Sequence, residues 1–266
     1  MGIKLLAIGN SFSEDATAYL KKISDSAGID VEITNLFVPG CSLEMDSDNL
    51  ADNKPAFRLD FNGVNSDRYI SIRDALKLDK WDIVTIQQES SRAGLIDSYY
   101  PYATELIDTI RQNVPDAKIY FHETWAYEID CLHAGFVNYD KQQLKMFDMI
   151  CQSVNRFCKE NDGISYIPCG EVIQELRRHP AFDYQNGGES LCRDGFHMSL
   201  IYGRYALAST WFETLFGGDI FEADFLPQAE DVINGFTIDS EHVTDKQKIE
   251  LIKQCVHNVC KQKKES

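Results

Sequence analysis

The first thirteen residues constrain the fold more than any other stretch of the chain. Residues 3–8 form a short apolar run with the length of a buried parallel strand. The run stops at a turn-forming cluster, residues 9–13, and helical periodicity begins at about Glu14. This order predicts that Ser11 lies at the carboxyl edge of a sheet, beside a helix N-terminus, where open α/β folds bind ligands. A simpler interpretation makes Ser11 or Ser13 only the N-cap of that helix.

The alternation of strands and helices continues along the chain. Further strands are expected at residues 31–38, 81–86, 117–122 and 164–167, and helices at about 14–27, 70–78, 99–113, 140–160, 171–178 and 200–216. Five strands alternating with helices predict a five-stranded parallel sheet in a three-layer α/β/α fold with flavodoxin-like order. Residues 43–68 are rich in Asp and Asn, which predicts an irregular excursion over the site.

No linker, repeat or low-complexity segment interrupts the sequence, so we expect one domain over residues 1–266. The last periodic segment, about residues 244–264, predicts a C-terminal helix that packs on this domain. Its apolar stripe is suited either to that packing or to a second subunit, so a homodimer is one expectation.

Charge excludes several classes of partner. The chain has 26 basic and 42 acidic residues, a net charge of −16, and should repel nucleic acid and anionic membranes. No apolar run approaches the roughly 20 residues of a membrane span. Lys4 lies inside the first apolar run, which is too short for a signal peptide. The sequence as written therefore predicts a cytoplasmic protein, or a periplasmic or secreted one if a leader has been removed.

The sequence gives little support for a metal or a cofactor. None of the eight cysteines forms a Cys-x-x-Cys pair, which argues against a zinc ribbon or a thioredoxin-type motif. His122 and Glu123 could be a metal pair, but no third ligand stands at a suggestive spacing. The first turn also lacks the glycine patterns of nucleotide-binding folds. We therefore expect neither metal nor cofactor.

Residues 192–199 hold a second candidate functional block. Asp194 and His197 are three residues apart, just before the helix expected at about 200–216. A carboxylate at this spacing can accept the Nδ1–H of the imidazole and leave Nε2 free as a base. Such a base could take the proton of Ser11 and make it a nucleophile. A simpler interpretation is a helix-entry contact without a catalytic role.

The cysteines Cys41 and Cys192 are alternative nucleophiles, because a thiolate needs less activation than a hydroxyl. Neither follows a strand-to-helix turn as Ser11 does.

Four blocks together resemble the SGNH (GDSL-type) hydrolase superfamily, over residues 3 to about 216. They are Gly-Asn-Ser after the first strand, a glycine after the second, an amide cluster after the third, and Asp-x-x-His near the C-terminus. The resemblance implies that Ser11 is the nucleophile, His197 the base and Asp194 its orienting carboxylate. It also implies that the backbone N–H of Gly40 belongs to the oxyanion hole.

The third block departs from the superfamily, which usually has Gly-x-Asn there. Residues 87–91 read Gln-Gln-Glu-Ser-Ser. A glutamine amide, one methylene longer, can supply the missing N–H, so we expect Gln88 in the oxyanion hole, with Gln87 as second choice. Together with the block at residues 124–127, this departure indicates an uncharacterised bacterial branch of the superfamily.

The resemblance implies a serine esterase that works through an acyl-enzyme. Aromatic residues near the strand ends could stack on a sugar, which favours an O-acetyl carbohydrate ester; they could equally pack the rim of the core. Trp125 and Tyr127 are the expected substrate-binding residues, with Tyr99, Tyr100 and Tyr102 nearby. The alternatives are a lipase or thioesterase of the same superfamily, and a ligand-binding protein that kept the fold but lost the chemistry.

Overall fold

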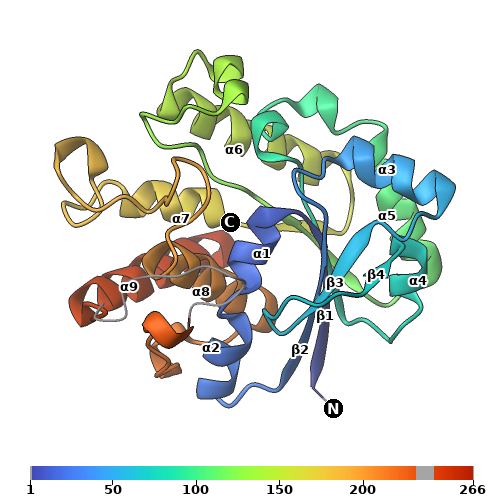
Figure 1. Ribbon diagram of the computed structural model, residues 1–266, viewed down its shortest axis with the longest axis horizontal. Coiled ribbons are helices and arrows are strands. Elements are labelled where there is room, and N and C mark those ends of the chain that lie inside the picture. Colours follow the sequence, from blue (N-terminus) through green and yellow to red (C-terminus); the bar gives the residue numbers. More distant parts are fainter. Residues whose placement is uncertain (1, 232–242, 266) are drawn as a thin grey trace.

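The computed structural model describes residues 2–231 and 243–265, and a mixed sheet forms its centre (Figure 1). The strands lie in the order β4-β3-β2-β1-β5-β6-β7. Five of them are parallel, in the expected flavodoxin-like order β2-β1-β5-β6-β7. The strand bounds are Ile3–Gly9 (β1), Val31–Phe37 (β2), Phe57–Phe61 (β3), Tyr69–Ile70 (β4), Ile83–Ile86 (β5), Lys118–His122 (β6) and Ile164–Ile167 (β7).

Beyond β2 the sheet continues with two antiparallel strands, so the expectation of a purely parallel five-stranded sheet was wrong. Residues 43–68 are not irregular: they contain helix α3 (Leu43–Asp52) and strand β3. The Ser42 hydroxyl caps α3 by accepting the N–H of Met45, and Asn53 ends it in the left-handed conformation. The many Asp and Asn residues suggested a loop because they are untypical of regular elements, but some are exposed, such as Asp48 and Asp52, whereas Asp46 and Asp60 are buried in α3 and β3.

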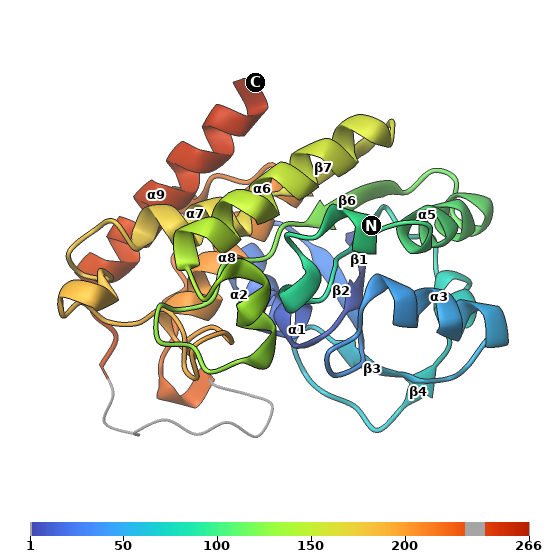
Figure 2. The ribbon, with the colours of Figure 1, turned by 90° about the horizontal axis from the view of Figure 1, so that it is seen from above.

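Helices cover both faces of the sheet (Figures 1 and 2). On one face α8 packs against α1, α2, α7 and α9; on the other, α3, α4 and α5 pack together, and α6 runs beside β7. The helix bounds are Ser11–Thr17 (α1), Leu20–Ser26 (α2), Ile72–Leu76 (α4), Tyr102–Asn113 (α5), Gln143–Glu160 (α6), Cys169–Leu176 (α7), Tyr202–Phe216 (α8) and Lys246–Glu265 (α9).

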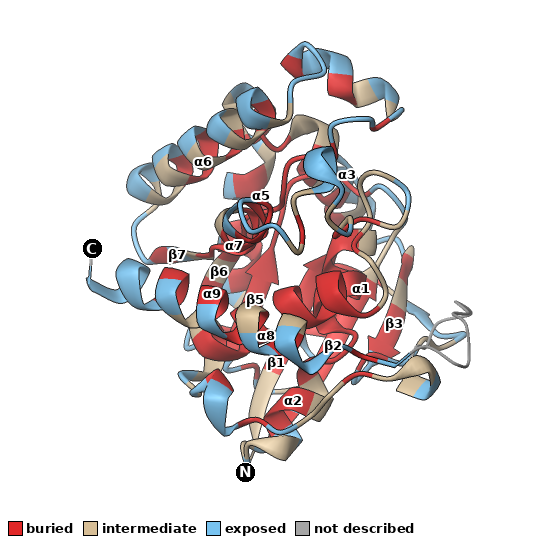
Figure 3. Ribbon diagram, turned by 90° about the vertical axis from the view of Figure 1, so that its left-hand side faces the viewer, coloured by how far each residue is buried: buried red, intermediate tan, exposed pale blue. Residues whose placement is uncertain are grey.

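Burial is concentrated in the parallel strands and in the helices that lie directly on them, as Figure 3 shows for α1 and α8. The single helix expected at about 14–27 is two helices, α1 and α2, broken between Thr17 and Leu20. The expected C-terminal helix is present as α9. Its apolar stripe is buried against the rest of the chain and is therefore not available to a second subunit; the stripe comprises Ile249, Ile252, Val256, Val259 and Cys260.

Among the described residues, no helix combines the length and the apolar character required to span a membrane.

Candidate functional site

Ser11 is the first residue of α1, directly beyond the carboxyl end of β1. The N-cap is Asn10 rather than Ser11 or Ser13: its Oδ1 accepts the N–H of Phe12 at 2.9 Å. Asn10 also donates its amide to the Cys41 carbonyl at 2.9 Å, which ties this turn to the loop after β2. Because Asn10 makes the cap, the Ser11 hydroxyl is left for other partners.

The structure brings Ser11, His197 and Asp194 into one hydrogen-bonded chain. His197 Nε2 lies 2.8 Å from Ser11 Oγ, and His197 Nδ1 lies 2.7 Å from Asp194 Oδ2. The backbone N–H of His197 donates to the other carboxylate oxygen at 2.8 Å. Partial burial raises the pKa of Asp194, but the hydrogen bonds from His197 outweigh it and leave that pKa below its ordinary value. An ionised Asp194 fixes the ring with its proton on Nδ1 and leaves Nε2 as the acceptor for Ser11.

A tight turn holds Asp194 and His197 in this geometry. Gly195 has φ +88°, a conformation that favours glycine, and a Cβ there would lie 3.2 Å from Cys131. The Gly195 carbonyl accepts the N–H of Glu128 at 2.7 Å, and the Phe196 carbonyl accepts the indole N–H of Trp125 at 2.7 Å. The segment that follows β6 therefore fixes the turn from outside.

Asp15 joins the two halves of the site, and sequence reasoning missed it. This fully buried carboxylate, four residues after Ser11, pairs with Arg193 at 2.9 Å and Arg204 at 2.8 Å. It also accepts the N–H of Met198 at 3.0 Å. The only sequence signal was an acidic side chain on the buried face of the first helix; its partners, nearly two hundred residues away, could not be identified.

A cavity of about 420 Å³ opens in front of the Ser11 hydroxyl. The residues that line it include Ser11, Gly40, Glu89, His133, Phe196 and His197. Among the described residues, no hydrogen-bond partner occurs for the backbone N–H of Ser11 or of Gly40. Both are therefore free to bind an oxygen atom in this cavity.

The two glutamines are not at this cavity. The Gln88 amide gives its hydrogens to the carbonyl and hydroxyl of Ser98, at 2.9 and 3.1 Å, and its oxygen accepts the N–H of Leu43. Gln87 donates to Asn10 Oδ1 at 2.7 Å. The expectation that Gln88 or Gln87 supplies an oxyanion donor is therefore corrected: their amides are used to hold neighbouring loops.

Trp125 and Tyr127 do not face the cavity either, because both are fully buried. Trp125 stacks on Phe12, with ring centroids 4.0 Å apart, and so supports the residue that follows Ser11. The Tyr127 hydroxyl lies 2.7 Å from Ser90 Oγ. Two phenylalanines that were not expected at the site do line the cavity: Phe12, which is buried, and Phe196, which is partly exposed. The ring centroid of Phe196 lies 4.2 Å from that of His197.

Neither alternative cysteine is suited to be a nucleophile. Cys41 is buried and donates to Asp46, and burial raises the pKa of its thiol. Burial raises the pKa of Cys192 to about 12. A thiol held protonated in this way is a poor nucleophile at neutral pH.

The comparisons with known proteins agree with this fold. A family model described as "Domain of unknown function (DUF4886)" matches residues 4–235. The crystal structure of a DUF4886 family protein from Bacteroides uniformis is 34% identical with a TM-score of 0.85, covering 97% of this chain and 94% of that one. Among curated proteins, none matches the sequence.

More distant structures share the fold. A candidate SGNH hydrolase from Slackia heliotrinireducens is 18% identical, with a TM-score of 0.51, covering 81% of this chain and all of that one (100%). A carbohydrate esterase family 3 protein from Talaromyces cellulolyticus is 12% identical, with a TM-score of 0.53, covering 81% of this chain and 97% of that one. The chain thus has the SGNH hydrolase fold, as the sequence motifs predicted.

Proposed function

The chain belongs to the DUF4886 family, and we propose that it is a serine esterase that removes small acyl groups, acetyl above all, from a carbohydrate. The observation that carries the proposal is the chain of hydrogen bonds from Asp194 through His197 to Ser11, at 2.7 and 2.8 Å. A hydroxyl is inert near pH 7 unless a base takes its proton, and this arrangement supplies the base and the group that orients it.

The mechanism follows from these positions. His197 Nε2 takes the proton of Ser11 as its Oγ attacks the ester carbonyl, and Asp194 stabilises the imidazolium that forms. The backbone N–H groups of Ser11 and Gly40 stabilise the negative oxygen of the tetrahedral intermediate. His197 then protonates the departing alcohol, and it activates the water that releases the acyl group from Ser11.

We propose His133 as a third donor, in place of the amide that Gln88 does not supply. Its Nδ1 accepts the backbone N–H of Gly135 at 3.1 Å and lies 3.3 Å from the Tyr127 hydroxyl. A neutral imidazole that accepts at Nδ1 carries its hydrogen on Nε2. Because His133 lines the same cavity as Ser11, that N–H is suited to bind the oxygen of the substrate carbonyl.

The small acyl group and the carbohydrate are supported by the shape and chemistry of the cavity. At about 420 Å³, the cavity is near the lower end of the range for small-molecule sites, which favours a small acyl group over a long lipid chain. Its lining combines apolar residues, such as Phe12 and Phe196, with the carboxylate of Glu89. The partly exposed ring of Phe196, beside polar acceptors, is suited to a sugar. The fold shared with a carbohydrate esterase family 3 protein is consistent with this substrate class.

The proposal is tested by removing the nucleophile and the base separately. Ser11→Ala and His197→Ala should each lower turnover of p-nitrophenyl acetate and of acetylated xylo-oligosaccharides by roughly 10⁴-fold or more. Both variants should keep the melting temperature of the wild type within a few degrees, because neither side chain is deep in the core. Turnover that persists in the Ser11→Ala variant would end the proposal.

A binding protein that retains the fold is the second candidate, favoured by the carboxylate of Glu89 at the cavity, near where the superfamily has an asparagine. A fluorophosphonate probe distinguishes the two. Labelling at Ser11 that is lost in the His197→Ala variant supports the esterase, and absence of labelling favours the binding protein.

A further inference from the structure

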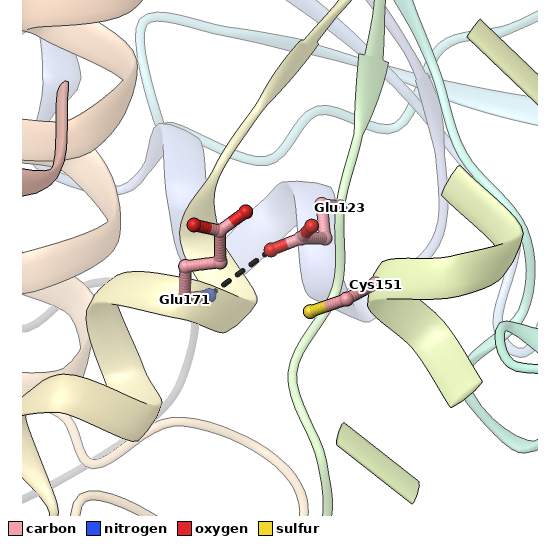
Figure 4. Close-up of side chains that lie close together, drawn as sticks. All are labelled: Glu123, Cys151 and Glu171. Atoms are coloured by element: carbon pink, nitrogen blue, oxygen red, sulfur yellow. Dashed lines mark hydrogen bonds between the residues drawn. The ribbon is translucent and has the colours of Figure 1, made fainter. Parts of the chain in front are cut away.

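A second group of potential ligands lies where β6 meets α6 and α7. Glu123 directly follows β6, Cys151 is in α6, and Glu171 is in the first turn of α7 (Figure 4). One carboxylate oxygen of each glutamate and the cysteine sulfur all lie within 4.8 Å of one another. Three separate segments of the chain thus bring potential metal-ligand atoms together in one place.

Glu123 is the unusual member of this cluster, because its side chain is 0% exposed. Its Oε1 accepts the backbone N–H of Glu171 at 3.0 Å, whereas its Oε2 has no hydrogen-bond partner among the described residues. Figure 4 shows this carboxylate directed toward Glu171 and Cys151. Burying a carboxylate oxygen without a hydrogen-bond partner costs free energy of folding, and a bound cation would offset that cost.

The backbone leaves room for the Glu123 carboxylate. A Cβ on Gly170 would lie 2.9 Å from Glu123 Oε1 and 2.3 Å from the Thr124 carbonyl oxygen. A side chain at Gly170 would therefore require the Thr124 backbone and the Glu123 carboxylate to move. Glycine permits α7 to begin directly against Glu123.

The cluster is also accessible from solvent. Cys151 and Glu171 are partly exposed and line a cavity of about 850 Å³ between α6, α7 and α9. Of the described residues that line this cavity, none also lines the cavity in front of Ser11. An ion can therefore reach the cluster without passing through the proposed esterase site.

We propose that Glu123, Cys151 and Glu171 bind a divalent metal ion of the zinc type. Two carboxylate oxygens and one thiolate sulfur are a donor set that Zn²⁺ accepts, whereas Mg²⁺ and Ca²⁺ prefer oxygen alone. Three protein ligands leave a fourth position for water. The ion would join the end of β6 to α6 and α7. Its ligand Glu123 stands two residues before Trp125, whose ring packs on Phe12 beside Ser11. We infer a structural role that supports the esterase site from behind.

Lys263 competes with the ion for one ligand. Its ammonium group lies 2.7 Å from Glu171 Oε1, which also accepts the Tyr166 hydroxyl at 3.1 Å. Metal binding must displace this lysine or share the carboxylate with it. Lys263→Gln should therefore tighten zinc binding several-fold.

Cobalt absorption tests the site directly in the full chain, because Co²⁺ bound to a thiolate has a sulfur-to-metal charge-transfer band. The band should appear on titration of the wild type with Co²⁺ and disappear when Zn²⁺ is added. It should be absent from Cys151→Ser and present in the matched variant Cys158→Ser, which alters a half-buried cysteine of the same helix outside the cluster. A missing band in the wild type, or a band that survives Cys151→Ser, would overturn the proposal.

Zinc-dependent stability supplies a second readout that does not depend on esterase activity. Saturating Zn²⁺ should raise the melting temperature of the wild type and of Cys158→Ser, with little effect on Cys151→Ser. His257→Asn is the control for another group of possible ligands, Glu213, Asp219 and His257. If His257→Asn abolishes the zinc effect and Cys151→Ser leaves it unchanged, the metal binds elsewhere and the proposal is wrong.

Discussion

His133 and His179 accept the same kind of local backbone hydrogen bond but line different cavities, and His133 also lies 3.3 Å from the Tyr127 hydroxyl. In each, Nδ1 accepts a backbone N–H two residues ahead, from Gly135 at 3.1 Å and from Ala181 at 3.2 Å. His133 lines the cavity in front of Ser11, whereas His179 lines the one beside α7. The two residues therefore separate the effect of losing a local hydrogen bond from the effect of losing a donor at the site.

We expect His133→Ala to lower kcat for acetyl ester hydrolysis by roughly 10²-fold, the usual effect of losing one oxyanion donor. KM should change little, because the donor acts mainly in the transition state. His179→Ala is the matched control and should leave both constants unchanged. Equal losses of activity in the two variants would show that His133 acts only through the fold.

His122 is a fully buried histidine near the site. Its Nδ1 lies 3.1 Å from Gln87 Oε1, and Gln87 in turn bonds Asn10, the residue before Ser11. Because Gln87 gives an amide hydrogen to Asn10 and presents its oxygen to His122, the imidazole must donate from Nδ1. Burial lowers the pKa of His122 to about 3.

This histidine should make the protein sensitive to acid. In the unfolded chain its pKa is about 6.5, so between pH 6.5 and 3 the unfolded state binds one proton more than the folded state. The free energy of unfolding should therefore fall by about 1.4 kcal/mol for each unit by which the pH is lowered in this range, on account of His122. Urea unfolding measures how far the free energy of unfolding decreases from pH 7 to pH 5. This decrease should be about 2 kcal/mol smaller in His122→Asn, which keeps an N–H for Gln87, than in the wild type. An identical drop in both proteins would contradict the prediction.

At the scale of elements, the proposed triad depends on how α1 meets the turn before α8. Ser11 begins α1, whereas Asp194 and His197 lie in the turn at residues 193–198. Asp15 bridges them through Arg193, Arg204 and the Met198 N–H. A shift of either element by about an ångström would separate the hydroxyl from the imidazole, which can cost about 10²-fold in rate.

Asp15→Asn should destabilise the protein by about 3–5 kcal/mol, because it removes a buried negative charge that pairs with the fully buried Arg204 at 2.8 Å. At a temperature where the variant is still folded, kcat should also fall. The control is Asp25→Asn, which breaks the surface pair with Lys21 and should cost less than about 1 kcal/mol. Chemical denaturation measures both, and equal costs would show that Asp15 is not the link between the two elements.

At the scale of the whole molecule, net charge selects among substrates. The chain carries a net charge of −16. Three acidic residues, Glu14, Glu89 and Asp194, line the cavity in front of Ser11. Among the described residues that line it, Arg193 is the only arginine. The field around the cavity should repel a polyanionic substrate and leave a neutral one unaffected.

The ratio of kcat/KM for an acetylated neutral oligosaccharide to that for an acetylated uronate oligosaccharide should therefore exceed one and fall as salt is added. Raising the ionic strength from 0.01 to 0.15 M shortens the screening length from about 30 to about 8 Å. Steady-state rates at the two salt concentrations measure the effect. A ratio that does not change with salt would mean that long-range charge has no part in substrate choice.

The parallel strands, their order and the position of Ser11 could be predicted from the amino-acid sequence, because each depends on local patterns. Burial and backbone hydrogen bonding give strands and helices distinct periodicities, and the turn after β1 is encoded by adjacent residues. The contact between Asp194 and His197 is equally local. The antiparallel β3 and β4 were missed because polar residues around them resemble a loop.

The directions of the side chains at the strand ends depend on the folded molecule and could not be predicted. Gln88 turns to Ser98, and Trp125 and Tyr127 pack inward, because partners distant in sequence satisfy their polar atoms and bury their rings. The same holds for the Asp15 bridge and for the cluster around Glu123, each of which joins segments that no spacing rule connects. Such contacts are selected by packing and hydrogen-bond satisfaction over the whole molecule, and these do not appear in any local pattern.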